Sequence, residues 1–451
     1  MKSRRLFLRQ SLAVTAGFAG LSTFLRLPME AAPLDMGRGE DGWLEVPEGF
    51  SARIISRKGD RMSDGLFVPG KADGMAAFAH KGKVVLIRNH EINPNSRENG
   101  PFGDQLDLLS KVDRKRIYDY GFGKSPGLGG TTNVVFNEET QAVEEQYLSL
   151  AGTNRNCAGG PTPWQSWLTC EEDVTPMGGE AEKFHGYTFE VPVHSRGLAD
   201  PVPLREMGRF NHEAVCVDPK TGIVYLTEDR HDSLIYRFIP KAKGKLARGG
   251  TLQALCVRNQ KGFDTRNWEG QYIKPGEQLD TIWITMTDVD SPKDDLRIRG
   301  HEQGAARFAR GEGMWFGNNE VYFACTNGGQ KKAGQVFRYA PSPKEGTSLE
   351  QGSPGKLSLF AEPNDTAILQ YCDNLTVSPW GDVVFVEDCN NAYMRGITPQ
   401  GTIYNIARNV GSRSELAGVC FSPSGKTLFV NIQDEGLTYA VTGPWHELRK
   451  I

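Results

Sequence analysis

Short apolar stretches alternate with turns along most of the chain. Five segments share one order of features: residues 156–193, 211–240, 311–341, 372–401 and 416–445. Each begins with a short apolar strand, continues through a turn into a strand rich in β-branched and aromatic residues, and ends in a polar stretch and a third strand. Turns such as residues 218–222, Asp-Pro-Lys-Thr-Gly, are typical of tight hairpins, because proline presets φ and glycine supplies a positive φ. Residues 73–91 supply a sixth copy.

Repeats of this kind predict a radial arrangement, because one such unit cannot bury both of its own faces. We therefore expect an all-β fold, a six-bladed β-propeller. A pair of β-sandwiches is the main alternative, but it does not explain the nearly equal intervals between like positions. Residues 99–130 break the pattern and carry apolar residues at helical spacing, which predicts a helical insertion between early blades. Residues 248–300 depart from it too and predict an extended loop.

The composition favours a globular protein that acts on a small solute. A formal net charge of -3 gives no basic excess for binding the phosphates of a nucleic acid. Eight cysteines among 451 residues are too few for a disulfide-built scaffold. We expect a monomer.

The first 32 residues resemble a twin-arginine export signal. Arg4 and Arg5 precede an apolar stretch at residues 12–25, and Ala31 and Ala32 follow as small residues. The apolar stretch is shorter than the roughly 20 residues that a helix needs to cross a bilayer, so we expect no stable membrane span. The sequence predicts export in the folded state by the twin-arginine translocase to the periplasm or beyond, with an ordinary secretory signal as the alternative.

Acidic residues recur at two positions of the repeat. In a propeller, the inner strand of each blade begins, and the second strand ends, at the same end of the central channel. The first position holds Asp73, Cys157, Glu213, Glu312, Asp373 and Glu415, and the second holds Glu91, Glu171, Glu172, Glu228, Asp229, Thr326, Glu387 and Asp388. The interval between them is 14 residues in three repeats when it is counted to residues 171, 326 and 387. We therefore expect one ring of polar side chains.

Such a ring predicts bound metal, because carboxylates that crowd together either raise one another's pKa or need cations. Oxygen ligands suit hard cations such as calcium, whereas a thiolate favours a transition metal such as iron. Cys157 lies in a polar, glycine-rich stretch, which is unusual for a cysteine of the core. A thiolate ligand and a buried free thiol are both compatible with that setting.

Arg310 stands two residues before Glu312, so both side chains emerge on the same side of a strand. A guanidinium at the channel can bind a phosphate through two parallel hydrogen bonds, whereas an arginine on the outer rim would simply face solvent. His90 and His212 directly precede Glu91 and Glu213. Alternation turns both rings away from the channel, so we interpret them as structural hydrogen-bonding groups.

Several segments resemble the PhoX family of exported bacterial alkaline phosphatases, and the similarity runs from about residue 42 to the C-terminus. They are NCAGGPTPWQSWLTCEED, GRFNHEAVCVDP, VYLTED, YRFIP, RGEGMWF, CDNLTVSPWGDVVFVEDC and ELAGVCFSPSGKTLFVNIQ. The resemblance implies a six-bladed propeller with two ferric and three calcium ions at its centre. By it, residues 42–451 form one catalytic domain, Cys157 is an iron ligand, Glu213 and Glu312 bind or bridge iron, and Arg310 is a catalytic residue that binds the substrate phosphate.

The remaining members of the expected site complete the set. Glu91, Glu171, Glu172 and Asp373 match acidic positions of that family, Asp73 and Glu387 join them as metal ligands, and Asn133 is expected to contact substrate. The expected reaction is hydrolysis of a phosphomonoester with release of inorganic phosphate. A calcium-dependent lactonase, a quinone-type dehydrogenase and a non-catalytic propeller held together by metal are the alternatives.

Overall fold

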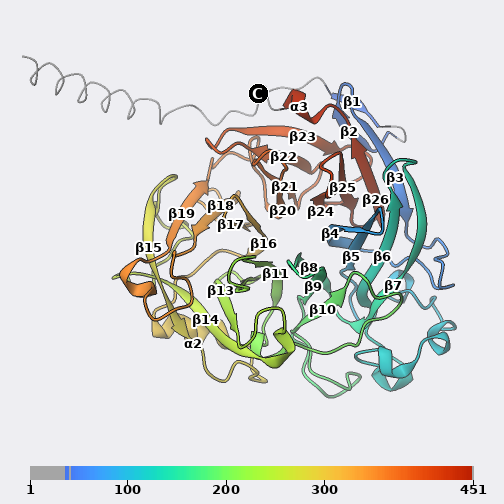
Figure 1. Ribbon diagram of the computed structural model, residues 1–451, viewed down its shortest axis with the longest axis horizontal. Coiled ribbons are helices and arrows are strands. Elements are labelled where there is room, and N and C mark those ends of the chain that lie inside the picture. Colours follow the sequence, from blue (N-terminus) through green and yellow to red (C-terminus); the bar gives the residue numbers. More distant parts are fainter. Residues whose placement is uncertain (1–35, 40–41, 449–451) are drawn as a thin grey trace, which may run out of the picture.

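The computed structural model describes residues 36–39 and 42–448. The expected export signal at residues 1–32 lies outside these ranges. The described chain is an all-β protein with a propeller-like ring of sheets around a central axis (Figure 1). Within the described ranges there are two α-helices, α2 (Leu296–Gln303) and α3 (Trp445–Leu448). Neither of them has the length and the apolar character that crossing a membrane would require.

The centre of the ring is built from inner strands, each paired antiparallel with the strand that follows it. Each inner strand contacts the next, and the last contacts the first, which closes the ring. We number these pairs as units 1 to 6. The units are β4 (Ala72–His80) with β5 (Lys83–His90), β8 (Asn156–Pro161) with β9 (Ser166–Glu171), β11 (His212–Val217) with β12 (Val224–Glu228), β16 (Gly311–Gly317) with β17 (Glu320–Cys325), β20 (Cys372–Val377) with β21 (Val383–Glu387), and β24 (Leu416–Phe421) with β25 (Thr427–Ile432).

Outer strands extend the units into sheets, and two sheets join at the periphery. The outer strands are β6 (Gly129–Asn137), β7 (Ala142–Thr153), β10 (Thr188–Pro192), β13 (Tyr236–Pro240), β14 (Gly250–Val257), β15 (Gln278–Thr285), β18 (Gln335–Ala340), β19 (Lys356–Ala361), β22 (Tyr393–Ile397), β23 (Ile403–Asn409) and β26 (Leu437–Thr442). Because β15 pairs with β19, units 3 and 4 share one nine-stranded sheet. The region expected to form an extended loop, residues 248–300, thus supplies two of these strands and α2.

The N-terminal strands complete two C-terminal sheets. Strand β3 (Ser51–Arg57) pairs with β26, and β1 (Met36–Arg38) and β2 (Leu44–Pro47) extend the sheet of unit 5 through β23. Strands far apart in sequence therefore tie the two ends of the chain together.

The prediction of a helical insertion between blades is wrong, because the segment forms no α-helix and lies within a single sheet. The segment lies between β5 and β6, within one sheet, and forms the 3-10 turns η2 (Leu109–Lys111), η3 (Arg114–Arg116) and η4 (Gly121–Gly123), with η1 (Arg97–Asn99) just before it. Leu106 and Phe122 have φ of 59° and 54°, which an α-helix does not permit. Leu108, Leu109 and Ile117 pack instead into a cluster that also contains Met62 and Leu148.

A β-bulge interrupts every inner strand near its start. The register shifts after Ala72, Asn156, His212, Gly311 and Cys372, and one residue later, after Ala417, in unit 6. A bulge breaks the strict alternation of side chains, so successive residues can face the channel.

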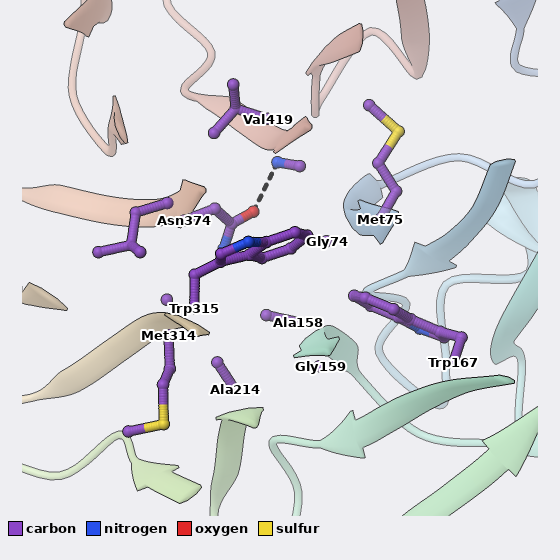
Figure 2. A pocket seen from close by; sticks show the side chains of 13 residues that line it. Gly74, Met75, Ala158, Gly159, Trp167, Ala214, Met314, Trp315, Asn374 and Val419 are labelled. Atoms are coloured by element: carbon purple, nitrogen blue, oxygen red, sulfur yellow. Dashed lines mark hydrogen bonds between the residues drawn. The ribbon is translucent and has the colours of Figure 1, made fainter. Parts of the chain in front are cut away.

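Beyond the bulges, small and apolar side chains fill the channel (Figure 2). Gly74, Ala158 and Ala214 lie beside the rings of Trp167 and Trp315, and the residual space is only about 20 Å³. A Cβ on Gly74 would come within 2.5 Å of the Ala158 Cα, so the inner strands approach too closely for a larger residue there. We call this region the apolar plug, and it leaves little free space in the channel next to the polar site.

Candidate metal centre

A cavity of about 180 Å³ lies in the channel next to the apolar plug. Its walls are almost entirely charged or polar. The lining residues are Asp73, Glu91, Arg155, Cys157, Glu172, Glu213, Asp229, Arg310, Glu312, Asp373, Asp388, Glu415 and Gln433. They come from all units of the ring, as the sequence argument required.

Three positions of each unit bring these side chains together. We call the residue directly before the inner strand the collar residue: Lys71, Arg155, Asn211, Arg310, Tyr371 and Glu415. The second residue of the inner strand is the ring residue: Asp73, Cys157, Glu213, Glu312 and Asp373, with Ala417 in unit 6. The residue directly after the second strand is the strand-end residue: Glu91, Glu172, Asp229, Thr326, Asp388 and Gln433.

One backbone hydrogen bond repeats in all of these units. The N–H of each strand-end residue donates to the carbonyl of the collar residue of the same unit, at 2.8 to 3.4 Å. This bond holds the end of the second strand beside the start of the first. In units 1, 2, 3 and 5 the strand-end and ring side chains therefore enter the cavity together, whereas Thr326 of unit 4 and Ala417 of unit 6 do not line it.

The crowded carboxyls hold their protons strongly in the absence of cations. Burial and the neighbouring Glu312 raise the pKa of Glu213 well above its usual range, and burial and Asp229 do the same for Glu312. Burial and Asp388 raise the pKa of Asp373 to about 7. The pKa values of Asp73, Glu172 and Glu415 are raised as well, in each case by burial first and a neighbouring acid second. Cations would relieve this repulsion.

Three groups of side chains have ligand atoms within 4.8 Å of one another, close enough to share an ion. Cys157, Glu172 and Glu213 form the first group, Asp73, Glu91 and Glu415 the second, and Glu213, Glu312 and Asp373 the third. The first group offers a sulfur with two carboxylates, whereas the other two offer carboxylates only. The first group therefore suits a transition metal, and the other two groups suit hard cations.

Cys157 is buried and faces the acids. Its Sγ lies 3.3 Å from the carbonyl oxygen of His212 and 3.7 Å from that of Glu213. Burial, followed by the charge of Glu213, raises the pKa of the thiol. The thiol therefore needs a nearby cation to ionise. All eight cysteines of the chain lie in the described region, and none is in a disulfide.

Both arginines of the cavity are collar residues, and each is paired with two acids. Arg310 Nε and Nη2 lie 2.8 and 2.7 Å from the carboxylate oxygens of Asp229, and Nη2 is also 3.0 Å from Glu312 Oε1. Arg155 Nη2 contacts Glu172 and lies 2.5 Å from Glu91 Oε1. The Nε–Nη2 edge of Arg310, which could have held a phosphate, is thus occupied by Asp229.

Three residues expected in the site lie elsewhere. Glu171 accepts hydrogen bonds from His185 Nδ1 at 2.6 Å and from three backbone N–H groups, and Glu387 binds Arg395 Nε at 2.7 Å and two backbone N–H groups. Asn133 is buried in the sheet of unit 1 and donates to the Tyr147 hydroxyl at 3.2 Å. Glu171 and Glu387 are the last residues of their strands, so alternation turns them into the sheet, while the next residue faces the cavity.

Arg155 and Gln433 line the cavity without having been predicted there. The signal for Arg155 was available, because it precedes Cys157 by two residues as Arg310 precedes Glu312. Gln433 carries no charge and therefore did not belong to the acidic pattern. It donates hydrogen bonds to Asp73 Oδ2 at 2.8 Å and to Glu91 Oε2 at 3.0 Å.

His90 and His212 point away from the cavity, as alternation predicted. His90 Nδ1 lies 2.9 Å from the carbonyl of Gly70, and His212 Nε2 lies 2.9 Å from the carbonyl of Gly208. Burial lowers the pKa of His212 to about 4, so the ring is neutral at pH 7.

Comparison with known proteins gives one match to a protein family and several similarities to solved structures. The family described as alkaline phosphatase PhoX matches residues 32–138 and 128–436. No curated protein matches. Among solved structures, the gluconolactonase XC5397 from Xanthomonas campestris is 12% identical, with a TM-score of 0.43 over 92% of this chain and 98% of that chain. A luciferin-regenerating enzyme is 10% identical, with a TM-score of 0.42 over 88% and 96%.

Proposed function

The chain belongs to the alkaline phosphatase PhoX family, and from this premise we propose that it hydrolyses phosphomonoesters in the central cavity. The observation that carries the proposal is the lining of that cavity, where a thiol, many carboxyls and two guanidiniums converge from separate units. In this proposal, each unit is one blade of a six-bladed propeller, and residues 42–451 form one catalytic domain. The chain is exported by the twin-arginine route and acts as a monomer.

We propose that the acids and Cys157 hold two ferric and three calcium ions. Iron suits the group with the thiol, Cys157, Glu172 and Glu213, and calcium suits groups of oxygen ligands such as Asp73, Glu91 and Glu415. Bound cations would supply positive charge to the phosphate oxygens. They would also lower the pKa of a bound water molecule towards neutral pH.

The chain's own side chains have three tasks in this reaction. Arg310 offsets negative charge on the phosphate, while Asp229 and Glu312 hold its guanidinium in place. The apolar plug leaves little free space on one side of the cavity, which favours entry of water and substrate from the other side. The lining residues include no Ser or Thr, so the proposal assigns no protein hydroxyl as nucleophile.

Metal content and turnover of the purified mature protein test the proposal together. We expect stoichiometric iron and calcium and hydrolysis of p-nitrophenyl phosphate, with turnover lost after both metals are stripped and regained when they are restored. Undiminished turnover by the metal-free protein would contradict the metal mechanism. Iron-free protein that hydrolyses a lactone and no phosphate ester would favour the lactonase alternative.

Replacement of Arg310 tests its part in the reaction. We expect Arg310→Ala to lower kcat/KM for p-nitrophenyl phosphate by about 10²- to 10³-fold, because a fixed positive charge is lost from the site. Arg338→Ala is the control, because Arg338 belongs to the outer strand β18 and pairs with Glu320 on the neighbouring strand. Equal activity of Arg310→Ala and wild type would remove Arg310 from the reaction.

A further inference from the structure

We propose that Arg155 is a second phosphate-binding residue, which acts on the same group of the substrate as Arg310. The inference rests on the proposed phosphatase function. Arg155 did not belong to the sequence pattern of acids. Its equivalence to Arg310 follows from the repeat of the fold.

Arg155 and Arg310 occupy equivalent positions in units 2 and 4. Both are collar residues, and both line the cavity. Their φ values are 43° and 52°, and the collar residues Lys71 and Tyr371 share this left-handed conformation, so it belongs to the repeat of the fold.

The two arginines also have one equivalent partner each. Each reaches the strand-end acid of the preceding unit, which is Glu91 for Arg155 and Asp229 for Arg310. Each then pairs with a second acid of its own unit, Glu172 and Glu312 respectively. The fold thus places two guanidiniums at one level of the cavity, with unit 3 between them.

The hydrogen bonds of Arg155 leave a donor for a ligand. Both of its ion pairs use Nη2, whereas its Nη1 has no hydrogen-bond partner among the described residues. An oxyanion is the acceptor that a guanidinium N–H binds best. Arg310 differs in that Asp229 also occupies its Nε. Phosphate can therefore bind Arg155 without displacing either acid.

The affinity for inorganic phosphate, the reaction product, tests this role apart from turnover. Metal-loaded wild type, Arg155→Met and Arg155→Lys would be compared by calorimetric titration with phosphate, together with their iron and calcium contents. We expect Arg155→Met to keep its metals and to bind phosphate at least 10-fold more weakly. Arg155→Lys should lie between it and wild type, because an ammonium keeps the charge and loses the planar donor edge.

Lys71→Met is the matched control. Lys71 is the collar cation of unit 1 and pairs with Asp434, but it does not line the cavity. Its replacement should leave phosphate affinity unchanged. Phosphate affinity of Arg155→Met within twofold of wild type would overturn the inference.

Loss of metal from Arg155→Met, with unchanged phosphate affinity of its loaded fraction, would also overturn the inference, because Arg155 would then only position Glu91 and Glu172. Failure of the proposed function looks different: wild type would bind phosphate, and lose that binding in Arg155→Met, yet hydrolyse no ester. That result would still support Arg155 as an anion-binding residue.

Discussion

At the scale of single residues, one step along the chain separates a carboxyl that lines the cavity from a structural carboxylate. Glu171 ends β9 and lies inside the protein, where it and Asp119 enclose the His185 ring. Glu172 is the next residue and lines the cavity. The acidic pair was visible in the sequence, but its division into two roles depends on where the strand ends.

The pair allows a test with two matched variants. We expect Glu171→Gln to leave the metal content unchanged and to lower the free energy of unfolding by about 3 kcal/mol, because a buried histidine loses one of its charged partners. Glu172→Gln should do the reverse, with less bound metal and a smaller loss of stability in the stripped protein. Metal analysis and urea denaturation of both variants would decide. The reversed pattern, with metal lost only from Glu171→Gln, would contradict the placement of the cavity.

At the scale of elements, the repeat was largely predictable from sequence and the exact register was not. The alternation of apolar strands and turns located the paired strands, and the candidate acids Asp73, Glu213 and Glu312 do meet in one cavity. Counting a fixed interval of 14 residues selected Glu171 and Glu387, because hairpin length varies between units and a bulge adds residues to the inner strand. The segment before β6 was predicted to be helical because its leucines have helical spacing. That spacing does not reveal the positive φ at Leu106, which an α-helix does not permit.

Close packing of the inner strands gives a test at this scale. A Cβ on Gly313 would lie 2.5 Å from the Asn374 Cα and 2.6 Å from the Leu375 N, and backbone atoms cannot move aside cheaply. We expect Gly313→Ala to lower the free energy of unfolding by about 1 to 3 kcal/mol. Gly352→Ala is the control, since a Cβ there meets nothing within 4 Å and should change stability by no more than about 0.5 kcal/mol. Equal stability of the two variants would mean that the strands are not packed this closely.

At the scale of the whole molecule, the ring gathers more acid than the protein can neutralise. Ion pairs from Arg155 and Arg310 reach Glu91, Glu172, Asp229 and Glu312, while Asp73, Glu213 and Asp373 have no ion pair with a cationic side chain in the described chain. Pairing of β3 with β26 ties the first and last units together, which opposes separation of the inner strands in response to the repulsion. Protons or metal ions must therefore carry the remaining positive charge.

This excess predicts how stability depends on pH. A carboxyl whose pKa is raised on folding, such as Asp373 at about 7, keeps its proton in the folded state at pH values where the unfolded chain has lost it. Folding of the stripped protein therefore weakens as pH rises from about 4 to 7, by on the order of 1.4 kcal/mol per pH unit for each such group. His185 acts in the same direction. Burial alone lowers its pKa, but Glu171 and Asp119 raise it to about 10, so its contribution is present below about 6.5 and is lost as pH rises through 10.

Metal should reverse this dependence, because carboxylates and the thiol must lose their protons to bind it. We expect the stripped protein to be less stable at pH 8 than at pH 5, and the protein with excess iron and calcium to be more stable at pH 8, as measured by chemical denaturation. Asp373→Asn should flatten the slope of the stripped protein, since one of the raised carboxyls is removed. A stripped protein that gains stability as pH rises would show that the acids are already ionised and paired without metal, and the reason for placing a cluster in the channel would be gone.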